Sequence, residues 1–136
     1  MPRIRYEPAP DVCRVIPLIV ESAPRSLSHV DPGLVRCVRS WGSSSRAIAR
    51  IYGMPRAWIA ALGWNPGYVI EVLHEKYDSL PPERKLEVLV HELLHIPKGM
   101  GGGLRPHGRL VNSRRVRMVI REIRSRGTLR SILEEL

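Results

Sequence analysis

The chain has 136 residues, enough for a modest hydrophobic core, and we expect residues 1–136 to form a single domain. Its 22 Lys and Arg residues outnumber its 13 Asp and Glu residues, and the formal net charge of +9 makes polyanions candidate partners. No run of about 18 apolar residues occurs and no apolar signal segment follows Met1, so we expect a cytoplasmic protein without a membrane span.

The first half of the chain predicts short elements. Residues 10–24 are apolar but interrupted by prolines, which favours a short helix. Alternating apolar and polar residues predict a strand over residues 34–39, and a less regular alternation indicates another over 47–52. Residues 54–62 are compatible with a helix or with a strand.

The second half predicts a strand over residues 68–73, followed by helices. A proline pair marks the start of an amphipathic helix over about 82–96, and Pro97 marks its end. We expect a second amphipathic helix over 109–125 and a short terminal helix from about Leu129. Together these elements predict an α+β fold in which a small mixed or antiparallel sheet packs against the 82–96 helix.

The segment His91-Glu92-Leu93-Leu94-His95 is the most informative motif, and it falls in the last turns of the 82–96 helix. Helical residues at positions i and i+4 share one face, so both imidazoles can reach the same ion. Glu92 is then placed beside that ion. This pattern is typical of zinc peptidases, in which two histidines bind zinc and the glutamate acts as a general base.

A catalytic zinc needs a third protein ligand and an open position for water. Four glycines follow the motif between Gly99 and Gly103, and a tight reversal there would return His107 to the ion. We therefore expect His107 to be the third ligand. Glu122 is the alternative, because it is the only acidic residue between His107 and Glu134. Three histidines with water suit zinc better than iron or manganese, which usually bring more carboxylates.

The other histidines and the two cysteines carry weaker signals. We expect His29 to lie in a loop and His74 at a strand end, neither binding metal. Cys13 and Cys37 do not have metal-binding spacing, and a disulfide between them would be unusual in the cytoplasm.

Positive charge is concentrated late in the chain. Eight arginines lie between Arg105 and Arg126, with Glu122 as the only acid among them. One interpretation is a solvated face of the 109–125 helix, and the other is a surface that binds nucleic acid. No aromatic residue interrupts this helix, so stacking on bases is not expected there.

Four segments of the chain form a joint pattern, namely Ala49–Arg56, Tyr68–Val72, His91–Pro97 and Gly102–Gly108. With these segments the chain resembles a known family, the metallopeptidases of prokaryotes and phages, a small group of minimal zincin-like proteins. The resemblance covers roughly residues 27–112. It implies a zincin-like fold, Zn²⁺ bound by His91, His95 and His107, and catalysis by Glu92. A more distant similarity is to minimal DNA-associated proteases that carry the same motif.

The function predicted from these features is zinc-dependent hydrolysis of a peptide or protein, with Glu92 transferring the proton of the attacking water. The developing oxyanion needs a further donor, and the candidates for this role or for substrate contact are Arg105, Arg109, Asn112 and Tyr68. The 68–72 strand is expected near the cleft, where a substrate backbone can add to a sheet edge. The alternatives are a nucleic-acid-associated binding protein with a structural or vestigial zinc site, and a regulatory partner protein.

Overall fold

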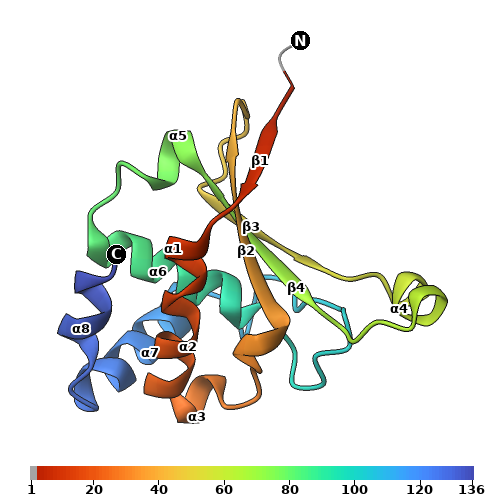
Figure 1. The fold of residues 1–136 in the computed structure, drawn as a ribbon. Helices are drawn as coiled ribbons and strands as arrows, with labels where there is room; N and C mark the ends of the chain where they lie inside the picture. Colours follow the sequence, from red (N-terminus) through yellow and green to blue (C-terminus); the bar gives the residue numbers. More distant parts are fainter. Residues whose placement is uncertain (1–2) are drawn as a thin grey trace.

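The protein is described by a computed structural model covering residues 3–136 (Figure 1). Its architecture is α+β, with a small mixed sheet of four strands and several helices, as the sequence predicts. Figure 1 shows most of the helices gathered on one side of the sheet.

The sheet has the strand order β1 (Arg5–Pro8), β2 (Val35–Trp41), β4 (Tyr68–Leu73), β3 (Ala49–Gly53). β4 runs parallel to β2 and antiparallel to β3, while β1 pairs antiparallel with β2. Every residue of β4 except Val69 is buried, which its largely apolar sequence, interrupted only by Glu71, anticipates for a strand covered on both faces. β4 is therefore interior, and β1 and β3 are the two edge strands of the described sheet.

The helices differ in how they are anchored. The central packing unit is α6, which contacts α7, α8 and β3. In contrast, α4 extends from the far end of β3 and β4 and has no buried residue (Figure 1). The α-helices are α1 (Pro10–Cys13), α2 (Val15–Ser22), α3 (Pro24–Leu27), α4 (Arg56–Leu62), α5 (His74–Tyr77), α6 (Pro82–Leu94), α7 (Ser113–Ser125) and α8 (Leu129–Glu134).

The position of α6 follows from its sequence. Pro82 occupies the first turn, where a missing N–H is no loss, and Glu83 lies near the positive end of the helix dipole. Leu86, Leu89 and Leu93 recur at helical spacing and are fully buried. Burial of this stripe fixes the rotation of the helix, and hence the directions in which the side chains of its last turns can extend.

Most predicted elements are present, with shifted ends. The strand over 68–73 is confirmed, and the element over 54–62 is a helix. The prediction that a helix begins at residue 109 is wrong, because α7 begins at Ser113. Asn112 caps it by accepting a hydrogen bond from the N–H of Arg115, and this cap leaves the preceding residues in a loop.

Pro17 does not break the N-terminal apolar segment, because it lies in the first turn of α2, where its missing N–H is tolerated. The strand β1 and the short helix α5 have no counterpart among the predicted elements.

Candidate metal centre

Three histidines converge at the end of α6. His91 lies in its last turn, His95 directly follows it, and His107 arrives from the glycine-rich loop. One ring nitrogen from each of the three lies within 4.8 Å of the other two. The Nε2 atoms of His91 and His107 are 3.0 Å apart, close to the separation of about 3.3 Å between two nitrogens of a tetrahedral zinc site. The grouping can hold a metal ion.

Backbone contact between two glycines brings the loop to this position. An added Cβ on Gly53, at the end of β3, would lie 1.8 Å from the carbonyl oxygen of Gly102, so only glycine permits this approach. Gly102 itself has a φ of +99°, a backbone conformation that residues with a side chain rarely adopt. The Tyr68 hydroxyl completes the attachment, accepting from the Gly102 N–H and donating to the Gly103 carbonyl, both at 2.9 Å.

Asn112 restrains the segment directly after His107. Its side-chain amide donates to the Gly108 carbonyl at 2.6 Å, and the Gly108 N–H donates to the Val111 carbonyl at 2.9 Å. The same side chain caps α7, so the start of that helix and the backbone next to His107 are held by one residue.

The orientation of His95 is set by the loop backbone. Its Nδ1–H donates to the carbonyl oxygen of Arg105 at 2.6 Å, and the Arg105 N–H donates back to the His95 carbonyl at 2.7 Å. A carbonyl can only accept, so the proton of neutral His95 must reside on Nδ1. Nε2 is then left with its lone pair, the form in which a histidine binds metal.

His91 is electrostatically suited to the same role. Burial lowers its pKa below the ordinary value, and the charges of His95, His107 and Arg84 lower it further. A lower pKa keeps the imidazole neutral near pH 7, and metal binding requires the neutral imidazole.

Glu92 is the buried carboxylic acid next to this cluster. Its side chain is 7% exposed, and burial raises its pKa to about 7. No neighbouring charge contributes to this shift. A carboxyl group with a pKa near neutrality can both accept and return a proton.

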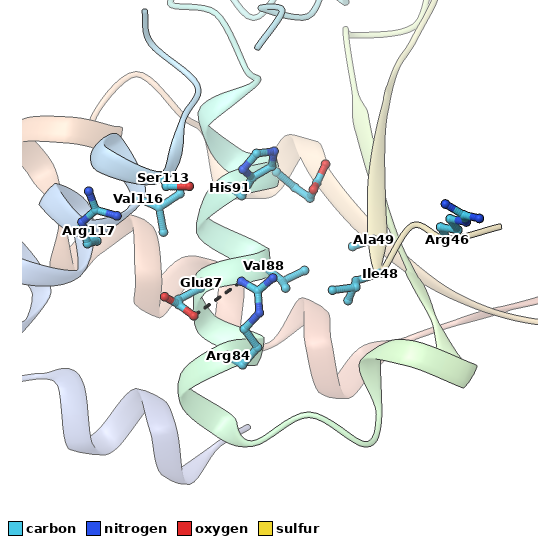
Figure 2. Close-up of a pocket in the computed structure, with 11 residues that line it drawn as sticks. Arg46, Ile48, Ala49, Arg84, Glu87, Val88, His91, Ser113, Val116 and Arg117 are labelled. Carbon is cyan, nitrogen blue, oxygen red and sulfur yellow. Dashed lines mark ion pairs between the residues drawn. The ribbon is translucent and has the colours of Figure 1, made fainter. Parts of the chain in front are cut away.

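A cleft of about 480 Å³ leads to His91 and Glu92. Figure 2 shows α6 along the middle of the cleft, with α7 residues on one side and residues at the start of β3 on the other. Arginines occupy three of its sides, and the Arg84 guanidinium is paired with Glu87 at 3.5 Å. The lining residues are Arg46, Ile48, Ala49, Arg84, Glu87, Val88, His91, Glu92, Ser113, Val116 and Arg117.

Comparison with protein families gives one match. The model of a family described as "Putative phage metallopeptidase" matches residues 4–124, which is most of the chain. The chain belongs to this family. Its name indicates a metal-dependent peptidase acting on protein substrates, and the three-histidine cluster is compatible with that. No curated protein and no solved structure matches the chain. Among residues 3–136, no helix is long and apolar enough to cross a membrane.

The structure places the other candidate residues outside the cleft. The Tyr68 hydroxyl is engaged by the loop backbone, and Asn112 by the Gly108 turn and the α7 cap. Arg105 lines a different cavity, and Arg109 is exposed. Tyr68, Asn112 and the Arg105 backbone thus position the histidines.

The alternative third ligand is placed elsewhere. The Glu122 carboxylate accepts from the Arg25 N–H at 2.6 Å and from the Ser26 hydroxyl at 2.8 Å, and it is not part of the histidine cluster. His29 contacts the Ile96 carbonyl and His74 contacts Asp78, so neither belongs to the cluster.

Sequence reasoning did not single out Arg46 and Arg84, and it assigned Arg117 only to a basic helix. No sequence pattern around these arginines predicts that they are neighbours. They come from the loop before β3, from α6 and from α7, and these segments meet only in the folded cleft.

Proposed function

We propose that the protein is a zinc-dependent peptidase with a zincin-like site, in which His91, His95 and His107 hold the zinc ion. The observation that carries this proposal is the convergence of three ring nitrogens beside a buried glutamate. An all-histidine donor set suits Zn²⁺, and the hydrogen bond from His95 to the Arg105 carbonyl is the kind of support that metal-binding histidines usually have.

Bound zinc supplies positive charge that makes a water molecule acidic near neutral pH. Glu92, as a carboxylate, would accept a proton from the water that attacks the peptide carbonyl. When the C–N bond breaks, Glu92 returns the proton to the departing amine, and the products are a carboxylic acid and a free amine. Glu92 is buried and lines the cleft together with His91.

The substrate backbone is proposed to lie along β3, the edge strand that borders the cleft. Ile48 and Ala49, at the start of this strand, line the cleft that also contains His91 and Glu92. An extended peptide can add to such an edge through backbone hydrogen bonds, which would bring a scissile carbonyl next to the histidines. The sequence suggested the strand over residues 68–72 as the strand beside the substrate. That strand is β4, which lies between β2 and β3 and has no free edge, so we propose β3 instead.

A purely structural zinc site offers a second interpretation, and Glu92 argues against it. Structural sites are usually closed by four protein ligands and need no general base. Here the cluster has three histidines, of which His107 is exposed, and an acid with a pKa near 7 lines the adjacent cleft.

The test is the Glu92→Gln variant, assayed with fluorescein-labelled casein as an unfolded substrate. We expect the zinc content per chain to match the parent protein and cleavage to fall by at least about 10²-fold, the usual scale for losing a general base. Glu83→Gln, an exposed change in the first turn of the same helix, is the matched control and should cleave normally. Equal cleavage by Glu92→Gln and the parent would exclude this mechanism.

A further inference from the structure

A strongly basic groove runs between α3 and α7. It consists of two adjoining depressions of about 640 and 430 Å³ that share Arg25, Ser26 and Met118 in their linings. We call it the α3–α7 groove. Six cationic residues line it, namely Arg25, Lys98, Arg105, Arg115, Arg121 and Arg126.

The positive charge of the α3–α7 groove is not neutralised from within. Glu122 is the only acidic residue in its lining, and its carboxylate oxygens are held by the Arg25 backbone N–H and the Ser26 hydroxyl. Within residues 3–136, none of the six cations takes part in a salt bridge. A concave surface that gathers this much unpaired positive charge attracts a polyanion.

The groove is separate from the peptidase cleft. Ser113, Val116 and Arg117 of α7 line the cleft, whereas Arg115, Met118 and Val119 of the same helix line the groove. The two surfaces therefore lie on different faces of α7, and both can be occupied at once.

We propose that the α3–α7 groove binds the phosphate backbone of double-stranded DNA, without sequence preference. Arginine, which supplies five of the six cations, contacts phosphate through two N–H groups at once, and the exposed Ser28 hydroxyl is a further phosphate donor in the lining.

The lining contains no tryptophan, tyrosine or phenylalanine on which an unpaired base could stack, which favours the duplex over a single strand. Two connected depressions also suit a continuous backbone better than one isolated anion. This inference does not depend on the proposed peptidase activity.

The test measures binding of fluorescein-labelled 20-base-pair duplexes by fluorescence anisotropy. If about six phosphates are neutralised, the slope of log K against log salt is about −5, and affinity falls by about 10³ between 50 and 200 mM KCl. Two unrelated sequences should bind equally, and a single strand of the same length should bind more weakly.

The variant Arg25→Gln/Arg115→Gln/Arg121→Gln removes three cations from the groove. It should reduce the salt slope by about 3 and lower the affinity at 100 mM KCl by about 10²-fold. The control, Arg36→Gln/Arg56→Gln/Arg130→Gln, changes the net charge equally at exposed arginines outside the groove and should stay near the parent affinity.

Three results would overturn the proposal: affinity independent of salt, equal losses in the groove and control variants, or displacement of the duplex by poly-glutamate at matched charge. The last result would indicate an acidic protein partner instead. Arg121→Gln and Arg126→Gln, both at exposed positions, provide single-substitution tests if the triple variant does not fold.

Discussion

Replacement of Gly53 by alanine tests the contact that brings the glycine-rich loop to the histidine cluster. The added Cβ would lie 1.8 Å from the Gly102 carbonyl oxygen and 2.9 Å from its carbon. Both atoms belong to the backbone, so no rotamer change can relieve the overlap, and one segment must move. To restore a separation of 3.0 Å, the loop must shift by more than 1 Å, which would strain the hydrogen bonds of Gly102 and Gly103 with Tyr68.

Overpacking of this kind costs about 1–3 kcal/mol, and weakening two hydrogen bonds adds about 1 kcal/mol. For a chain of this size, a total of about 2–4 kcal/mol corresponds to a Tm lower by about 10 °C. Thermal unfolding followed by circular dichroism measures this loss, and a zinc titration should show weaker binding because the loop carries His107.

Gly103→Ala is the matched control, since a Cβ there meets no atom within 4 Å and the backbone has no positive φ. We expect its Tm to stay within a few degrees of the parent. If Gly53→Ala also melted at the parent temperature and bound zinc equally, the loop could not be packed against β3 as described.

Further predictions concern the loop and the cleft. His107→Ala should weaken zinc binding by more than tenfold in competition with a chelator, and unchanged zinc stoichiometry and affinity would remove it from the ligand set. Tyr68→Phe removes the hydroxyl that bonds the Gly102 N–H and the Gly103 carbonyl. It should lower the free energy of unfolding, measured in urea, by about 1–3 kcal/mol and should weaken zinc binding. If only the rate of cleavage changed, Tyr68 would not be a positioning residue. Because arginines line the cleft, peptides with glutamate beside the scissile bond should have a higher kcat/KM than their glutamine counterparts. Arg117→Gln should reduce that ratio, and an unchanged ratio would separate Arg117 from substrate selection.

The central part of the candidate site could be anticipated from sequence because its geometry is local. His91 and His95 are separated by one helical turn, and a leucine stripe determines which way that helix faces. The glycines after the motif predicted that the chain would reverse and bring His107 to the other two histidines. They did not predict how the glycine-rich loop is attached to the sheet. That depends on Gly53 and Tyr68, which lie far from the loop in sequence and bear no local sign of contact with it.

The errors in the predicted elements also have physical causes. Arg109 to Val111 fit an amphipathic pattern, but Asn112 caps α7 by accepting from the Arg115 N–H, and the helix therefore starts later. Asn112 followed by Ser113 is a recognisable capping signal that was available in the sequence. The strand β1 offers no such signal, because its four residues are all exposed and it exists only through pairing with β2, about thirty residues away.

Arg105 connects two surfaces that are otherwise separate. Its backbone holds His95 through two hydrogen bonds, and the same residue lines the α3–α7 groove. Suppose that the groove binds DNA and the histidines bind zinc. A shift of Arg105 on DNA binding would then move the carbonyl that orients His95, and the two binding free energies would be coupled. Such coupling is reciprocal, so the factor by which DNA changes zinc affinity must equal the factor by which zinc changes DNA affinity. DNA in the groove would then alter zinc binding at the histidines even though the two ligands do not touch.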